Sequence, residues 1–270
     1  MAERLDKAIV ARGLAASRER AQGLIAAGLV LIDGQPAEKP SQPVGEEAEI
    51  VVTGEAYPYV SRGGVKMEAA LKHFRINVSG YRCLDVGAST GGFADCFLQR
   101  GAAHVIAVDV GHGQLAPKLA ADPRVELREG VNARYLSPEQ FPHKFDLAAV
   151  DVSFISLTLV LPAVAPLLRP GGFLIALVKP EFEAGREAVG PRGIVRSAAA
   201  RQRALDKIIQ FGKRDLGLQF RGAMRSPLAG GSGNREFIVC FRAPGAEPAR
   251  QAARSREAVA SPPESHAEEA

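Results

Sequence analysis

The sequence contains few cysteines, and their number and spacing exclude several kinds of site. Cys83, Cys96 and Cys240 are the only three, and none has the spacing of metal ligands. An odd number without paired spacing argues against a disulfide framework and a metal site, so we expect a reducing compartment, the cytoplasm. Cys83 and Cys240 lie in apolar runs and are expected to be small core residues.

The sequence also lacks a long apolar run. Its first residues, MAERLDKAIV, carry charges where a secretory signal needs its apolar stretch, so no such signal is expected. The uncharged run of residues 152–168 is interrupted by Pro162 and Pro166, and it is shorter than the roughly 20 residues of a spanning helix. We therefore expect no membrane association and interpret this run as a strand end followed by a core-facing helix.

Composition and length describe a globular chain with an uneven charge distribution. Of the 270 residues, 46% are hydrophobic and 24% charged, which excludes a disordered chain or a fibre and predicts one large or two unequal domains. Residues 61–242 contain 25 basic and 16 acidic side chains. Such an excess indicates a polyanion or a phosphate-bearing ligand, with ordinary solubility charge as the alternative.

Residues 1–56 are expected to form a small α+β domain. Apolar residues at helical spacing predict two short helices between Arg4 and Gly28, and Ser17 stands where the second helix needs an N-cap. Residues 29–32 and 49–52 are predicted strands, and Asp33-Gly34 is a strong turn signal after the first. Residues 57–64 would link this domain to the next, and Ser61-Arg62-Gly63-Gly64 would precede a helix that starts at Val65 or Lys66.

Residues 65–242 alternate between strand and helix patterns, which predicts an α/β fold with a Rossmann-like sheet. The connection between the last two strands is short and contains Pro227, Gly230 and Gly233, so we expect antiparallel edge strands. The predicted strands are Arg82–Val86, His104–Val110, Val125–Arg128, Phe145–Val150, Gly172–Val178, Leu218–Met224 and Arg235–Arg242. The predicted helices are Gly92–Arg100, Leu115–Ala120, Leu157–Leu168 and Ser197–Asp215. Residues 243–270 lack periodicity, and we expect a disordered tail.

A glycine-rich segment after the first strand of this sheet predicts a nucleoside site. Ligands of open α/β sheets bind at the carboxyl ends of the strands, and an acid after the second strand, here Asp109, can bond ribose hydroxyls. The spacing Gly87-x-x-x-Gly91-Gly92 differs from the dinucleotide fingerprint, which favours S-adenosylmethionine (SAM). The alternative is a tight structural turn beside an exposed carboxylate, and Asn132 is either an adenine contact or a turn residue. The predicted cofactor-binding residues are Asp85, Gly87, Ala88, Ser89, Thr90, Gly91, Gly92, Phe93, Asp109 and Asn132.

Four scattered charged residues are predicted to meet on the ligand side of the sheet. Asp151 and Lys179 follow the fourth and fifth predicted strands, Lys66 opens the preceding helix, and Glu236 begins the last strand. Charged groups next to apolar strands are costly unless they are paired, and two lysines can satisfy two acids. They form either a catalytic group or a purely structural set of ion pairs.

The chain resembles the TlyA family of rRNA 2′-O-ribose methyltransferases, relatives of the FtsJ-type enzymes. The resemblance rests on residues 61–66, 85–93, 151–156, 179–183 and 234–236. It also rests on the N-terminal domain, residues 1–56, called the head below, which is similar to the alpha-L RNA-binding module. It implies a catalytic tetrad of Lys66, Asp151, Lys179 and Glu236, SAM as cofactor, and ribosomal RNA or assembled ribosomal subunits as partner, with a cytidine as target. It also implies RNA contact through Arg4, Arg12, Arg18 and Arg20.

The chemistry of ribose methylation agrees with such a tetrad. A 2′-hydroxyl is a weak acid that must lose its proton, and Lys179 either takes that proton as a neutral amine or stabilises the alkoxide as an ammonium group. Lys66 would orient the ribose, and no metal is required. Residues 186–242 contain 12 basic and 4 acidic side chains. They predict a basic surface near the catalytic face, with Arg186, Arg192 and Arg196 as RNA-binding residues, Arg201 and Arg203 as further candidates for phosphate contact, and a solvated helix face as the alternative for some of them. Arg62, outside this range, is also a predicted RNA-binding residue.

Three other functions remain as alternatives. A non-catalytic RNA-binding protein would not need all four charged residues, and a pseudouridine synthase would share the head but lack the SAM segment. A haemolysin-type membrane-active protein needs an inserting segment, which residues 152–168 do not supply. The oligomeric state and the modified subunit are not predicted from the sequence.

Overall fold

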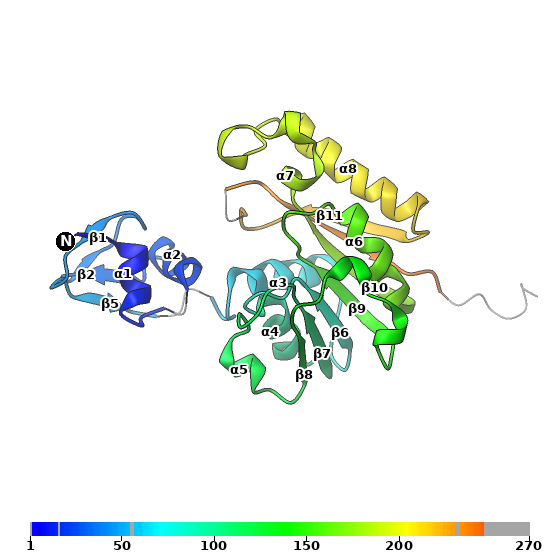
Figure 1. Ribbon diagram of the computed structural model, residues 1–270, viewed down its shortest axis with the longest axis horizontal. Helices are drawn as coiled ribbons and strands as arrows, with labels where there is room; N and C mark the ends of the chain where they lie inside the picture. Colours follow the sequence, from blue (N-terminus) through cyan, green and yellow to red (C-terminus); the bar gives the residue numbers. More distant parts are fainter. Residues whose placement is uncertain (1, 16, 55–56, 231–232, 246–270) are drawn as a thin grey trace, which may run out of the picture.

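The computed structural model describes residues 2–15, 17–54, 57–230 and 233–245 (Figure 1). Most of the expected tail, residues 246–270, lies outside the described residues, as do residues 55–56 at the expected end of the first domain. Within the described residues, no helix combines the length and the apolar character needed to cross a bilayer.

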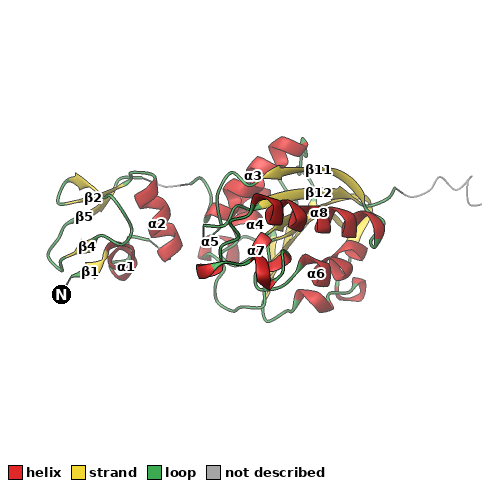
Figure 2. Ribbon diagram, turned by 90° about the horizontal axis from the view of Figure 1, so that it is seen from above, coloured by secondary structure: helices red, strands yellow, loops and turns green. Residues whose placement is uncertain are grey.

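The N-terminal elements lie at one end of the molecule, apart from the large sheet (Figure 2). Ser17 caps the second helix by accepting a hydrogen bond from the Arg20 amide, as predicted. Asp33 and Gly34 have φ values of 49° and 76°, the conformation that a tight hairpin turn requires. The elements are β1 (Glu3–Arg4), α1 (Leu5–Ala11), α2 (Arg18–Ala26), β2 (Val30–Ile32), β3 (Gln35–Pro36), β4 (Pro43–Val44) and β5 (Ile50–Val52).

The larger part of the chain forms a seven-stranded sheet with the strand order β11-β12-β10-β9-β6-β7-β8. The five strands β10, β9, β6, β7 and β8 are parallel, and β12 is antiparallel to both β10 and β11. The predicted α/β class with an antiparallel strand pair is therefore confirmed. The strands are β6 (Arg82–Val86), β7 (His104–Val108), β8 (Val125–Arg128), β9 (Phe145–Val150), β10 (Leu168–Val178), β11 (Gln219–Arg225) and β12 (Phe237–Arg242).

Helices cover both faces of this sheet because its strands are apolar on both sides. One face packs against α3 (Arg62–Phe74), α4 (Gly92–Gln99) and α5 (Pro117–Ala120), with Met67 and Phe97 fully buried. The other packs against α6 (Leu157–Val164) and α8 (Ala198–Arg214), with Leu161 and Ile208 fully buried. The short helix α7 (Pro180–Glu183) follows β10, and 3₁₀ turns occupy Ala133–Tyr135, Pro138–Gln140, Ala165–Leu167, Arg186–Ala188 and Pro191–Gly193.

Several element boundaries differ from the prediction. The largest differences are at the end of α6, which lies at Val164 and not Leu168, and at the start of β10, which lies at Leu168 and not Gly172. Helix α3 begins at Arg62, so Gly63 and Gly64 form its first turn and Lys66 lies one turn inside it. Glycine disfavours a helix, but a Cβ at Gly64 would overlap the ring of Tyr59, and this close packing explains why glycine is tolerated here. Glu236 precedes β12, which begins at Phe237.

The glycine-rich segment after β6 contacts the segment after β9. Gly87 has a φ of +84°, and a Cβ there would overlap the backbone oxygen of Asp151. At Gly87 it is therefore a neighbouring segment of the chain that makes the close approach a side chain would block. This contact places Asp151 beside the end of β6.

We expect Gly87→Ala to destabilise the protein at least twice as much as Gly113→Ala. Gly113 also has a positive φ, +65°, but no other atom lies within 4 Å of the position that a Cβ would take there, so its substitution costs only the conformational penalty of about 1–2 kcal/mol. Gly87→Ala must in addition push two segments apart. The measurement is the free energy of unfolding of both variants in denaturant, and equal losses would contradict the described contact.

Candidate active site

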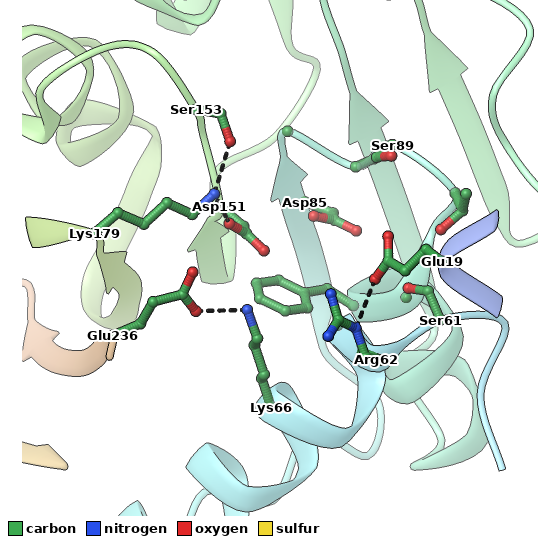
Figure 3. A pocket seen from close by; sticks show the side chains of 16 residues that line it. Glu19, Ser61, Arg62, Lys66, Asp85, Ser89, Asp151, Ser153, Lys179 and Glu236 are labelled. Carbon is green, nitrogen blue, oxygen red and sulfur yellow. Dashed lines mark hydrogen bonds and ion pairs between the residues drawn. The ribbon is translucent and has the colours of Figure 1, made fainter. Parts of the chain in front are cut away.

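A cavity of about 220 Å³ lies at the carboxyl ends of β6, β9 and β10 (Figure 3). It is lined by all four residues of the predicted tetrad, Lys66, Asp151, Lys179 and Glu236. Seven of the predicted cofactor-binding residues also line it, namely Asp85, Gly87, Ala88, Ser89, Thr90, Gly92 and Phe93. The structure thus brings residues from distant parts of the sequence to one place.

The four charged side chains form two ion pairs. Lys66 Nζ lies 2.6 Å from Glu236 Oε2, and Lys179 Nζ lies 2.7 Å from Asp151 Oδ1. Lys179 Nζ also donates a hydrogen bond to Ser153 Oγ at 2.9 Å. Each ammonium group therefore has a carboxylate beside it, which offsets part of the cost of removing these charges from water.

The two pairs differ in their access to solvent. The side chains of Lys66 and Glu236 are 9% and 3% exposed, whereas those of Lys179 and Asp151 are 12% and 21% exposed. A structural ion pair could account for the first pair, which is nearly sealed. The second pair is more exposed, mainly through the Asp151 side chain, which suits a group that acts on a bound substrate.

Asp85 lies at the base of the cavity with one oxygen unpartnered. Its Oδ2 accepts a hydrogen bond from the Ala94 amide at 3.0 Å, and its Oδ1 has no partner among the described residues. Burial is the main reason that the pKa of this carboxyl is raised to about 7; the nearby carboxylates Asp151 and Asp109 also act to raise it, and the Ala94 hydrogen bond acts to lower it. A buried oxygen of this kind fits a ligand that carries positive charge or donates hydrogen bonds.

Three of the predicted cofactor-binding residues do not line the cavity. Asp109 accepts hydrogen bonds from the amides of Ser89 and Gly111, both at 2.7 Å, and so holds the glycine-rich segment in place. Its carboxylate retains acceptor sites for a ribose. Asn132 caps the turn at Ala133–Tyr135 through the Arg134 amide, and a Cβ at Gly91 would overlap Leu119. Contact of Asp109, Asn132 and Gly91 with a cofactor stays a prediction.

Several residues of the cavity wall were not among those predicted from the sequence. Glu19, from the N-terminal helix α2, reaches the cavity and pairs with Arg62 Nε at 3.0 Å. Only the fold reveals this approach, because 43 residues separate the two. Ser61 and Ser153 also line the wall, and Ser153 could have been noticed from its position two residues after Asp151.

Several of the predicted RNA-binding arginines have partners within the protein. Arg4 and Arg18 each lie 3.0 Å from Asp6, whose side chain is fully buried and whose pKa these hydrogen bonds hold well below its usual range. Arg12 donates to backbone oxygens of Gly45, Glu46 and Ala48. These contacts fix the direction of each guanidinium group while the residues stay exposed.

The other predicted arginines lie in two places. Arg20 donates to the backbone oxygen of Tyr59 at 2.8 Å and lies over the ring of Tyr57, so it joins α2 to the segment before α3. Arg186, Arg192 and Arg196 are exposed on the segment between α7 and α8. RNA contact by all eight arginines stays a prediction.

Comparisons with known proteins agree with this architecture. Residues 59–243 match the family described as FtsJ-like methyltransferase, and residues 3–50 match the S4 domain. The chain is 47% identical over 240 residues to the 16S/23S rRNA (cytidine-2′-O)-methyltransferase TlyA of Mycobacterium tuberculosis, covering 88% of this chain and 89% of that protein. It is 39% identical to Hemolysin A of Brachyspira hyodysenteriae, covering 88% and 99%.

A solved structure from Streptococcus thermophilus, described as a candidate hemolysin, has a TM-score of 0.72 and 41% identity, and the match covers 96% of this chain and 98% of that one. The resemblance proposed from the sequence motifs is therefore confirmed. The chain belongs to the FtsJ-like methyltransferase family and carries an S4 domain in its N-terminal part.

Proposed function

We propose that this chain transfers the methyl group of SAM to a ribose 2′-hydroxyl of ribosomal RNA. The observation that carries the proposal is the Lys179–Asp151 ion pair, which opens on the same cavity as the glycine-rich segment. A relative that is 47% identical is a 16S/23S rRNA (cytidine-2′-O)-methyltransferase. We extend its substrate, a cytidine of rRNA, to this chain.

The segment from Asp85 to Phe93 would hold the cofactor. SAM supplies a methyl group that its positive sulfur already activates, so the transfer requires no metal ion. Asp85 presents a buried, unpartnered oxygen to the cavity, and this suits a ligand with a sulfonium and an ammonium group. Ser89 and Thr90 contribute polar atoms to the same wall.

Lys179 would act on the attacking oxygen. Its Nζ is held by Asp151 and Ser153 at the cavity, where an ammonium group stabilises the negative charge that develops as the 2′-hydroxyl reacts. Asp151 is our candidate acceptor for the hydroxyl proton. Lys66, paired with Glu236, would orient the ribose.

RNA would reach this cavity along the S4 domain and the exposed arginines Arg186, Arg192 and Arg196. Phe154, which follows Ser153 and is 92% exposed, offers a ring on which an unpaired base can stack. We infer that the substrate is rRNA, free or within ribosomal subunits, and that the reaction takes place in the cytoplasm. The three buried cysteines are unpaired, which suits a reducing compartment.

The alternative functions account for less of the structure. A non-catalytic RNA-binding protein would have no use for an accessible Lys179–Asp151 pair beside the glycine-rich segment. A membrane-active protein, suggested by the name of the Brachyspira relative, would need neither the buried carboxyl of Asp85 nor the Lys179–Asp151 pair beside the glycine-rich segment.

We expect Lys179→Ala to lower the rate of methyl transfer at least about 100-fold, the usual effect of removing a group that stabilises a developing oxyanion. The affinity for SAM should stay within about threefold, because the glycine-rich segment is untouched. The measurements are transfer of a labelled methyl group to rRNA and to purified ribosomal subunits, and SAM binding by calorimetry.

Lys213→Ala is the matched control, since Lys213 is exposed near the end of α8 and should leave both quantities unchanged. A Lys179→Ala variant with the wild-type rate would refute the assigned role. Failure of the wild-type protein to methylate any rRNA or subunit preparation would refute the proposed function itself.

We also expect SAM binding to release a proton from Asp85. The pKa of this carboxyl is raised to about 7 in the free protein, so at pH 6 the group is mostly neutral, and a cationic ligand lowers its pKa and drives the proton off. Affinity should therefore rise between pH 5 and pH 8. Calorimetry at pH 6 in two buffers of different ionisation enthalpy measures the released proton.

Asp85→Asn keeps the acceptor for the Ala94 amide but cannot ionise, so it should abolish this proton release and flatten the dependence of affinity on pH. Identical binding enthalpies of the wild-type protein in the two buffers at pH 6 would contradict the assignment.

A further inference from the structure

A second cavity, of about 520 Å³, adjoins the candidate active site at Glu236, which lines both. It lies between the start of α8, the end of β11 and the segment that leads into β12. Arg201, Arg225 and Arg235 line it, together with the apolar side chains of Leu228 and Phe237. Apart from Glu236 and the phosphate-contact candidate Arg201, no residue of its wall has a role assigned above.

The charge of this cavity is largely uncompensated. Among the described residues that line it, Glu236 is the only acidic one, and its carboxylate already pairs with Lys66 at 2.6 Å. Arg225 and Arg235 are exposed and have no hydrogen bond or ion pair from their side chains within the described part of the chain. Three guanidinium groups around one hollow attract an anion, and arginine suits the geometry of phosphate.

The third arginine is held in place. Arg201 Nη1 donates to the backbone oxygens of Val195 and Arg196 at 2.9 and 2.8 Å, and the other guanidinium nitrogens keep their donors available. The wall also includes Ala198, the first residue of the 17-residue helix α8. The positive end of that helix dipole adds to the attraction for an anion.

Resting on the function proposed above, we propose that this cavity binds the nucleotide that adjoins the target nucleotide in the RNA strand. Because Glu236 separates the two cavities, a ribose beside Lys179 places its neighbour in the strand within reach of the arginines. The arginines would bind the backbone phosphate, and Leu228 and Phe237 would contact the sugar or base. The bound phosphate fixes the register of the strand, and so selects which ribose faces Lys179.

The test is the double variant Arg225→Gln/Arg235→Gln. We expect its KM for rRNA to rise about tenfold, and the log–log slope of rRNA binding against salt to weaken by about 0.7 for each phosphate that the variant no longer neutralises. The affinity for SAM should stay within about twofold, because the glycine-rich segment is untouched. Methyl transfer, binding across a salt series and calorimetry measure the three quantities on the full chain.

Two further variants separate phosphate binding from a structural effect. Arg225→Lys/Arg235→Lys keeps both charges and should restore most of the slope, which a merely structural role would not. Arg214→Gln removes an exposed arginine at the opposite end of α8, roughly 24 Å away at 1.5 Å per residue. It should behave as wild type.

The outcomes also distinguish this inference from the proposed function. Wild-type methylation of rRNA together with unchanged KM and slope in the Arg225→Gln/Arg235→Gln variant would overturn the second site and leave the function intact. An equal weakening of the slope in the lysine variant would also overturn it. Absence of methyl transfer by the wild-type protein would overturn the function on which the inference rests.

Discussion

The candidate site depends on the pairing of four charges at the carboxyl edge of an apolar sheet. Neither lysine could stay beside buried strands without its acid, because an unpaired charge there is strongly unfavourable. The pairing draws α3, β9, β10 and the segment before β12 to one cavity. The nearly sealed Lys66–Glu236 pair supports the wall, and the more exposed Lys179–Asp151 pair lines the cavity.

The segment that carries Asp151 is held at both ends, which keeps this pair in position. At its start, the Asp151 amide donates to the Val86 oxygen at 2.9 Å, and Gly87 permits the close approach. At its end, the buried carboxylate of Glu183 accepts hydrogen bonds from Ser156 Oγ at 2.6 Å and the Leu157 amide at 2.7 Å. A group fixed in this way reacts without the cost of ordering it during catalysis.

The sheet and the meeting of the four charged residues could be predicted from the sequence because both follow from local rules. Apolar runs marked the strands, and Asp151 and Lys179 directly follow the runs of residues 147–150 and 173–178, so topology alone placed them at one edge. The predicted start of α3 was wrong because the low helix propensity of glycine was outweighed by the packing of Gly64 against Tyr59. The approach of Glu19 to the cavity and the partners of Arg12 depend on tertiary contacts that no local pattern encodes.

The central claim is that the methyl group arrives on a ribose oxygen, and the most direct test is to identify the methylated nucleoside. After reaction with rRNA or ribosomal subunits, the RNA is digested to nucleosides and separated by mass spectrometry against methylated standards. The account predicts a cytidine methylated at its 2′-oxygen. A methyl group on a base would contradict it, because the accessible Lys179–Asp151 pair would then have no hydroxyl to activate.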